Sequence, residues 1–129
     1  MENPYLSVII PAYNEEKTIS KTLLSIDQYL QKQNFPYEIL VVSDGSKDKT
    51  AQVVTDFQRS IGGLRLLDNK ENHGKGWVVR QGMLEAKGQI RLFMDADNAT
   101  TIDHFDKMKP YFEEGADVVI GTRDPKDAK

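Results

Sequence analysis

The sequence predicts an α/β fold of three layers, in which helices cover both faces of a mostly parallel, Rossmann-like sheet. Short apolar runs typical of buried strands alternate along the chain with segments whose apolar residues recur every three or four positions, as in amphipathic helices. The connections between these segments are short. Strand–helix–strand units with such connections are right-handed and parallel, which favours a doubly wound sheet.

Length, charge and composition limit what this fold can be. The chain has 129 residues, a formal net charge of −3 and no cysteine. We expect one domain, 1–129, since a chain of this length buries roughly two-thirds of its unfolded surface around one core. The negative charge argues against a nucleic-acid partner, and without cysteine there is no disulfide or thiol chemistry. No segment approaches about 18 apolar residues, so we expect a soluble, cytoplasmic chain.

The first strand–helix–strand unit is the clearest. Leu6–Ile10 is a nearly continuous apolar run that Pro11 is expected to end, as in a strand buried on both faces. Glu38–Ser43 is a second such strand. Between them we expect a helix capped by Asn14. Its buried face is formed by Ile19, Leu23, Ile26 and Leu30.

The rest of the chain repeats this alternation. In the third helix, we expect Val79, Gly82, Met83 and Ala86 to line one side. The expected elements, in chain order, are a helix from Asp48 to the glycine pair 62–63, a strand at Leu64–Leu67, a helix at Trp77–Ala86 ended by Gly88, a strand at Ile90–Met94, a helix from Ile102 to Phe112 that contains Pro110, and a strand at Asp117–Gly121.

Polar residues gather where the expected strands end. In doubly wound sheets, ligands bind at the carboxyl ends of the strands. That rule places five segments along one edge: Pro11–Glu15, Ser43–Ser46, Asn72–Gly76, Asp95–Asn98 and Gly121–Arg123. The first of them has no G-x-G-x-x-G pattern, which argues against a dinucleotide-dependent dehydrogenase.

Asp95 and Asp97 form a possible metal site, because one residue separates them at the end of a buried strand. Two carboxylates about 5 Å apart repel by roughly 3 kcal/mol at an effective dielectric constant of about 20. A divalent cation such as Mg²⁺ or Mn²⁺ offsets that repulsion. The structural alternative is an exposed acidic turn, with Asn98 and Thr100 capping the next helix.

Four other residues at this edge are candidates for binding a ligand. The ring of Tyr13 suits a base, and the Glu15 carboxylate suits a ribose hydroxyl, although an acid at a helix start is equally explained by the helix macrodipole. Asp44 precedes a glycine, as turn residues commonly do. Lys75 lies between two glycines, where it could reach a diphosphate or remain solvated.

Four motifs together resemble the inverting glycosyltransferases of family 2, which have the GT-A fold. They are SVIIPAYNEE at 7–16, VSDGSKDKT at 42–50, NHGKG at 72–76 and DAD at 95–97. Within that family, GKG at 74–76, VRQGM at 79–83, DADNAT at 95–100 and IGTR at 120–123 are similar to the dolichyl-phosphate and polyprenyl-phosphate β-glucosyltransferases.

The resemblance implies roles for individual residues. Pro11, Ala12, Tyr13 and Glu15 would cradle the nucleoside, and Asp44 would contact the base. Asp95 would lie near the ribose and the metal, and Asp97 would bind the Mg²⁺ or Mn²⁺ that bridges the diphosphate. Lys75 and Arg123 would lie near phosphate groups, with Asp97 and Arg123 serving the chemical step.

The resemblance also implies a reaction, the transfer of a sugar from a nucleotide to a lipid phosphate with inversion at the anomeric carbon. Related mannosyltransferases usually have a glutamine two places after the second aspartate, where this chain has Ala99. This difference favours UDP-glucose over GDP-mannose as the donor. The full-length protein would work at a membrane surface.

Members of this family have a longer catalytic domain, so the chain resembles a truncated form, the nucleotide-sugar-binding half. Two alternatives follow from the residues. A nucleotidyltransferase would need a glycine-rich, basic first loop, which Pro11–Glu15 is not. A folded module without donor binding would instead self-associate through surfaces exposed by the truncation, as a homo-oligomer.

Overall fold

The computed structural model describes residues 4–97 and 102–113 of the chain. Strands and helices alternate throughout, as the sequence predicts. In chain order they are β1 (Leu6–Ala12), α1 (Ile19–Gln31), β2 (Tyr37–Asp44), α2 (Thr50–Phe57), β3 (Leu64–Asn69), α3 (Lys75–Glu85), β4 (Ile90–Phe93), the 3₁₀ turn η1 (Ile102–His104) and α4 (Phe105–Glu113).

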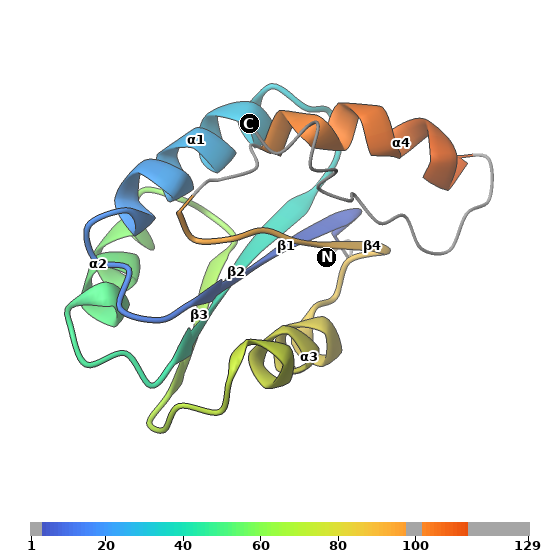
Figure 1. Ribbon diagram of the computed structural model, residues 1–129. Coiled ribbons are helices and arrows are strands. Elements are labelled where there is room, and N and C mark those ends of the chain that lie inside the picture. The colour runs from blue at the N-terminus through green and yellow to red at the C-terminus, as the bar shows by residue number, and fades with distance from the viewer. Residues whose placement is uncertain (1–3, 98–101, 114–129) are drawn as a thin grey trace, which may run out of the picture.

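The described strands form one parallel sheet in the order β3-β2-β1-β4 (Figure 1). The chain adds β2 and β3 on one side of β1 and then returns through α3 to place β4 on the other side. The strand order therefore reverses between β1 and β4. In an open α/β sheet this reversal is the switch point, where a crevice opens at the carboxyl ends of the strands.

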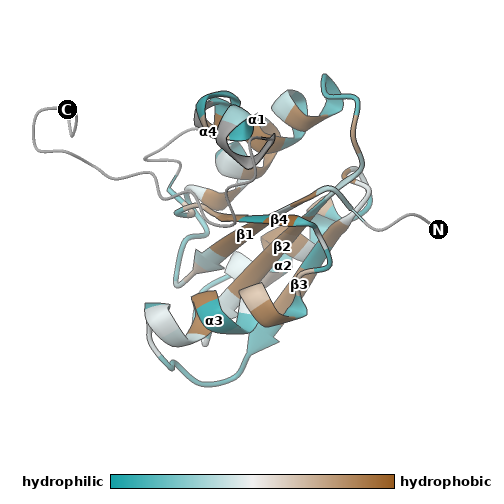
Figure 2. Ribbon diagram, turned by 90° about the vertical axis from the view of Figure 1, so that its right-hand side faces the viewer, coloured by the Kyte–Doolittle hydropathy of each residue, from teal (hydrophilic) through white to brown (hydrophobic). Residues whose placement is uncertain are grey.

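Helices cover both faces of the sheet, which confirms the three-layer prediction (Figures 1 and 2). Helices α1, α2 and α4 pack on one face, where Leu6, Val8 and Ile10 of β1 join the larger core cluster. Helix α3 covers the other face, where Ile9 points into a smaller cluster with Val78 and Ala86. Alternate residues of β1 thus enter two different cores, and all seven of its residues are buried.

The end of β1 and the start of α1 both differ from the predictions. Pro11 does not end the strand, which continues to Ala12. β4 pairs with β1 only as far as Ile9, so the missing N–H of Pro11 falls where β1 has one strand partner instead of two. Asn14 does not cap α1, which begins at Ile19 with Thr18 before it.

The third helix also differs from expectation. It begins at Lys75 instead of Trp77, and Ala86 already has an extended backbone, so Gly88 plays no part in ending it. Val78 is its most buried apolar side chain, whereas Val79 is only partly covered. The expected fifth strand, Asp117–Gly121, lies outside the described residues.

Candidate functional site at the carboxyl edge of the sheet

A pocket of about 460 Å³ lies at the carboxyl ends of β1, β2 and β4. The structure brings eight of the nine predicted site residues to it, and the ninth, Arg123, lies outside the described residues. The pocket is lined by Pro11, Ala12, Tyr13, Glu15, Asp44, Asn72, Lys75, Val78, Asp95, Ala96 and Asp97.

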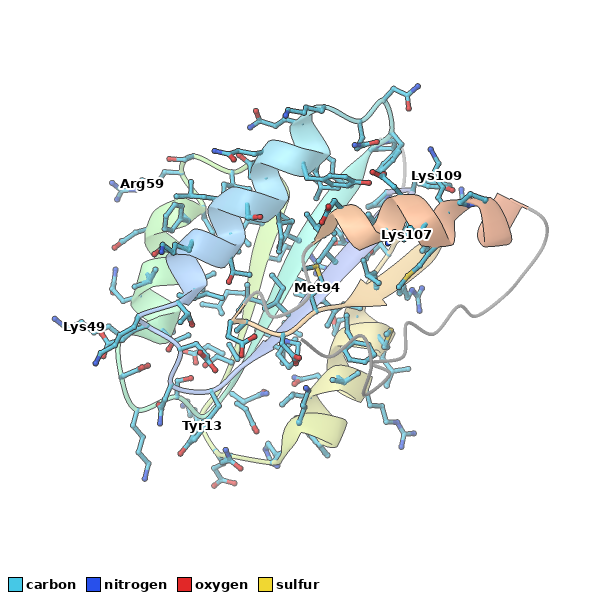
Figure 3. The ribbon with its side chains drawn as sticks, turned by 45° about the horizontal axis from the view of Figure 1, so that its top comes forward. Tyr13, Lys49, Arg59, Met94, Lys107 and Lys109 are labelled. Atoms are coloured by element: carbon cyan, nitrogen blue, oxygen red, sulfur yellow. The ribbon has the colours of Figure 1, made fainter. Side chains whose placement is uncertain are left out.

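The pocket sits at the switch point of the sheet. The ladder between β1 and β4 ends with the pair Ile9 and Phe93, after which the Met94 amide donates to the Ile9 carbonyl at 2.8 Å. The pocket is lined by Pro11 and Ala12 at the end of β1 and by residues 95–97 after β4. Tyr13 is 44% exposed and lies beyond the end of β1, on the side away from α4, whereas Met94 is buried in the larger core (Figure 3).

The loop after β1 is fastened to the loop after β2. Asn14 has a φ of 53°, and its backbone N–H donates to Ser46 Oγ at 3.0 Å. Its side-chain Oδ1 accepts from the backbone N–H of Lys47 at 2.8 Å. The Glu15 amide donates to Thr50 Oγ1 at 2.8 Å. These contacts hold the pocket wall formed by residues 11–15 against the loop after β2.

Asp48 strengthens this junction. Its carboxylate accepts from the Glu16 amide at 3.2 Å and from the amide and hydroxyl of Thr50. Burial alone would raise the pKa of Asp48, but these hydrogen bonds outweigh burial and lower the pKa below its ordinary value. Asp48 is therefore an ionised tie between the two loops and does not line the pocket.

Glu15 has one carboxylate oxygen engaged near the pocket. The Thr18 hydroxyl donates to Oε2 at 2.7 Å, and the Glu15 carbonyl accepts from the amides of Thr18 and Ile19. Glu15 thus stands four residues before the first residue of α1 and still lines the pocket. Both interpretations offered by the sequence, a helix-start acid and a ligand residue, remain compatible with this place.

Asp44 is 4% exposed at the carboxyl end of β2, and both of its carboxylate oxygens accept hydrogen bonds from one loop. Oδ1 accepts from the His73 amide at 2.6 Å, and Oδ2 accepts from the Gly74 amide at 3.0 Å. The Asn72 side chain also donates to the Asp44 carbonyl at 3.2 Å. The loop before α3 is therefore held directly against the end of β2.

This arrangement needs glycine at two positions. Gly45 has a φ of 70°, and a Cβ there would lie 2.6 Å from backbone atoms of Glu71 and Asn72. Gly74 has a φ of 95° and precedes the first residue of α3. The first glycine lets the loop approach β2, and the second turns its amide toward Asp44 as the helix begins.

Lys75 reaches across the pocket to the residues that follow β4. Its Nζ lies 2.5 Å from Asp95 Oδ1, and both side chains are about half exposed, at 60% and 45%. An ion pair this exposed contributes little to stability, at most about 1 kcal/mol. Its importance is geometric, because it places a cation and a carboxylate side by side in the pocket.

Residues 95–97 form a turn that α1 supports from beneath. Thr22 is fully buried in α1, and its hydroxyl donates to the Ala96 carbonyl at 2.6 Å. Ala96 is itself buried, while Asp95 and Asp97 on either side of it line the pocket. The buried carbonyl in the middle of the turn thus has a fixed direction.

The donor set of this turn suits a magnesium or manganese ion that shares its ligands with a phosphate. Within residues 4–97 and 102–113, no group of three or more His, Cys, Asp or Glu side chains could hold a metal. A cation at Asp95 and Asp97 would take its remaining ligands from water and a bound phosphate. Mg²⁺ commonly binds in this way, through one or two carboxylates together with substrate phosphates.

Sequence reasoning missed three residues that line the pocket and one that supports it. Asn72 lies in the NHGKG motif at 72–76, but the sequence pattern indicates no role for its side chain. Ala96 lies in the DAD motif at 95–97, but the sequence indicates no role for it. Val78 had no signal, because an apolar residue that lines a pocket resembles a core residue. Thr22 also had none, since its partner is 74 residues away in the chain.

The family model for glycosyl transferase family 2 matches residues 7–129 of the chain. A dolichyl-phosphate beta-glucosyltransferase of Trichomonas vaginalis is 40% identical over 129 residues, which are 92% of this chain and 39% of that protein. The chain spans between a third and two fifths of the length of curated relatives of this kind.

Two solved structures share the fold. S. aureus TarS 1-349 in complex with UDP-GlcNAc has a TM-score of 0.68 at 32% identity, over 84% of this chain and 31% of that one. The mannosyltransferase PcManGT from Pyrobaculum calidifontis, in complex with GDP-Man and Mn²⁺, has a TM-score of 0.64 at 29% identity, over 75% of this chain and 28% of that one. Among the described helices, none is long and apolar enough to cross a membrane.

Proposed function

Because the chain belongs to glycosyltransferase family 2 and has the GT-A fold, we propose that it supplies the donor-binding part of a metal-dependent, inverting hexosyltransferase. The donor is UDP-glucose, and the acceptor is a dolichyl or other polyprenyl phosphate. One observation carries the proposal, namely that Lys75, Asp95 and Asp97 line one pocket at the switch point of the sheet.

The β1 side of this pocket suits the nucleoside. Pro11 and Ala12 form a buried floor, and Tyr13 has an exposed ring that can stack on a base. Glu15 has one carboxylate oxygen held by Thr18, and its other oxygen can accept from a ribose hydroxyl. Asp44 also lines the pocket, and its carboxylate accepts from two amides of the loop before α3.

The β4 side suits the diphosphate. Asp95 and Asp97 would hold Mg²⁺ or Mn²⁺, which would supply Lewis-acid stabilisation of the negative charge that grows on the leaving phosphate. Lys75 pairs with Asp95 and would turn to a phosphate oxygen when the donor binds. Arg123, outside the described residues, is proposed as a second cation near the phosphates. Neighbouring structures with bound UDP-GlcNAc and with GDP-Man and Mn²⁺ support a nucleotide-sugar site of this kind.

The reaction requires few groups from the protein beyond those that bind the donor. An oxygen of the lipid phosphate attacks the anomeric carbon, the bond from that carbon to the diphosphate oxygen breaks, and UDP leaves. A single displacement converts an α-linked donor into a β-linked product. The attacking phosphate is already ionised near neutral pH, so no general base is needed.

Further observations support UDP-glucose as the donor and a membrane surface as the place where the full-length protein acts. Ala99 cannot supply the metal-binding amide that related mannosyltransferases usually have, which favours UDP-glucose over GDP-mannose. Curated relatives named as dolichyl-phosphate beta-glucosyltransferases support the same donor sugar and a lipid acceptor. A lipid acceptor places the full-length protein at a membrane surface.

Calorimetric titration tests this proposal. The chain is titrated with UDP-glucose and with GDP-mannose, each with and without Mg²⁺, and Asp97→Asn is the matched variant. We expect UDP-glucose to bind only with Mg²⁺ and the variant to lose that binding. Tighter binding of GDP-mannose would overturn the choice of donor, and no heat from either nucleotide with a folded chain would overturn the site.

The second candidate is a self-associating module without donor binding. Leu84 on α3 is 72% exposed and Phe93 on β4 is 49% exposed, which favours an apolar contact with another surface. Sedimentation of the chain at several concentrations tests this candidate. A mass that rises with concentration, together with no nucleotide binding, would support it, and a monomer that binds UDP-glucose would contradict it.

A further inference from the structure

The resemblance to glycosyltransferases gives Asp44 a contact with the nucleobase, but the geometry points to a different main task. We propose that Asp44 is a positioning residue whose carboxylate holds residues 71–74 against β2, so that Lys75 meets Asp95. This inference rests on the proposed donor site, since Lys75 is the group through which Asp44 acts on the diphosphate.

The contacts form a continuous path from β2 to β4. Both oxygens of the buried Asp44 carboxylate accept from the amides of His73 and Gly74, at 2.6 and 3.0 Å. The next residue, Lys75, is the first of α3 and reaches Asp95 Oδ1 at 2.5 Å. The backbone of Lys75 therefore follows directly after the anchored amide of Gly74, and its side chain extends from there into the pocket.

The backbone on both sides is shaped for this contact. The loop approaches Gly45 so closely that a Cβ there would lie 2.6 Å from the Asn72 amide nitrogen. The Asn72 side chain donates to the Asp44 carbonyl, which adds a third tie between the same two segments. The loop is held at its middle and at its end, and Lys75 emerges directly after the second point.

A carboxylate is needed because both partners are donors. An asparagine at this position would present one oxygen to one amide and an NH₂ group to the other, which would face an N–H group without an acceptor. Hydrogen bonds from backbone amides to a charged acceptor are roughly twice as strong as neutral ones. Asp44→Asn keeps the size of the side chain and removes this double anchor.

The competing role is recognition of the base. A carboxylate has about four acceptor positions, so two amide contacts leave room for a base N–H. The two roles differ in whether the effect of Asp44 on nucleotide binding depends on Lys75. A positioning residue acts through Lys75 and affects every nucleotide diphosphate alike, whereas a base-reading residue acts independently of Lys75 and changes the preference among bases.

A double-mutant cycle separates these roles. Binding of UDP and GDP with Mg²⁺ is measured for the wild-type chain, Asp44→Asn, Lys75→Met and the double variant. We expect Asp44→Asn to weaken the binding of both nucleotides by about tenfold, as the loss of roughly one charge-assisted hydrogen bond would. In the Lys75→Met background, Asp44→Asn should weaken nucleotide binding by less than about twofold. A loss confined to UDP and equally large in both backgrounds would overturn the inference.

Hydrogen exchange gives a readout that needs no ligand. The amides of His73 and Gly74 should exchange faster in Asp44→Asn and remain protected in Lys75→Met. Asp68→Asn is the matched control, because Asp68 is an exposed carboxylate on the adjacent strand β3. Unchanged protection of both amides in Asp44→Asn would overturn the inference. Protection that falls as expected, in a wild-type chain that binds no nucleotide, would overturn only the proposed function.

Gly45→Ala provides a second variant that leaves the carboxylate in place. Its Cβ would displace the loop from β2, so it should weaken the binding of UDP and GDP equally, and only while Lys75 is present. Protected amides in β1 show that each variant is folded. Full nucleotide affinity in a folded Gly45→Ala chain whose loop amides exchange rapidly would contradict the inference.

Discussion

Thr22 shows how one buried hydroxyl shapes the acidic turn from a distance. It sits on the buried face of α1 beside Leu23, and its Oγ1 donates to the Ala96 carbonyl at 2.6 Å. A buried carbonyl without a donor is costly, so this contact favours one orientation of the peptide between Asp95 and Asp97. The directions of both carboxylates depend on that orientation.

Thr22→Val should therefore lower the stability of the chain and weaken its site. Valine has the same shape but no hydroxyl, so the Ala96 carbonyl loses its donor, at a cost of about 1–3 kcal/mol in the free energy of unfolding. Metal-dependent binding of UDP-glucose should weaken as well. Urea denaturation and calorimetry measure the two effects. Thr22→Ser should restore donor binding, and a serine variant no better than valine would contradict this role.

At the residue scale, the sequence predicted which acidic residues reach the site but not which residues hold them in place. Asp95 and Asp97 could be placed because a strand ends just before them, and strand ends meet at one edge of the sheet. The expectation that this strand is buried is wrong, since Ile90 is the one buried residue among the four of β4. The partner of Thr22 could not be predicted, because a threonine on an apolar helix face has the same local pattern whether or not a distant carbonyl meets it.

At the scale of elements, the carboxylate of Glu38 joins several strands at their amino ends, opposite the pocket. Its carboxylate accepts from Ser7 Oγ at 2.6 Å, from the Lys87 amide at 2.7 Å and from Arg65 at 2.9 Å. It thereby joins β1, β2, β3 and the segment that leads into β4. Burial alone would raise the pKa of Glu38, but the hydrogen bonds from Ser7, Lys87 and Arg65 outweigh burial and lower the pKa below its ordinary value.

The sign of this shift predicts a pH dependence. Because the pKa of Glu38 is lower in the folded state, its contribution to stability is full well above the ordinary pKa of a glutamate. The contribution is lost as the pH falls through the lower, folded-state pKa. Glu38→Gln should be less stable than wild type at neutral pH, and the difference should shrink in acid. Urea denaturation from neutral to acid pH measures it. Glu85→Gln, at an exposed position, is the control, and a difference that grows in acid would contradict the account.

Gly82 lets α3 pack closely on the sheet. A Cβ at this position would lie 2.5 Å from Ile9 Cγ2 and 3.2 Å from Val42 Cγ2. Gly82→Ala should lower the free energy of unfolding by about 1–3 kcal/mol through overpacking. The better helix propensity of alanine offsets only about 1 kcal/mol of that loss.

Gly76→Ala is the matched control for this prediction. Gly76 lies in the same helix, and a Cβ there would meet no atom within 4 Å. Its substitution should leave stability unchanged or raise it slightly. Thermal denaturation compares the two variants, and equal effects at positions 76 and 82 would show that packing against Ile9 is not the cause.

At the element scale, the sequence predicted the order of strands and helices but not where the first and third helices begin. Asn14 resembles a cap, yet its side chain accepts from Lys47 in another loop. The third helix begins two residues early because Gly74, at a φ of 95°, turns the chain into Lys75 while Asp44 binds its amide. The tertiary hydrogen bonds of Asn14 and Gly74 are not contained in the local sequence patterns.

At the scale of the whole molecule, strand order creates the site. The sequence predicted parallel strands and a ligand at their carboxyl ends, but it did not predict the order β3-β2-β1-β4. The order depends on α3 crossing the opposite face of the sheet and returning β4 to the far side of β1. The apolar periodicity of a helix does not encode which face it will cover. That crossing brings Asp95 and Asp97 to the end of β1.

Paramagnetic broadening of NMR signals by Mn²⁺ tests the central claim most directly, namely that residues 95–97 and Lys75 form one donor and metal site. Substoichiometric Mn²⁺ with UDP-glucose should broaden the amide signals of Asp95, Ala96, Asp97 and Lys75 first. Asp97→Asn should abolish this selectivity. Broadening centred on another acidic segment, such as Asp103 and Asp106, or unaffected by Asp97→Asn, would contradict the account.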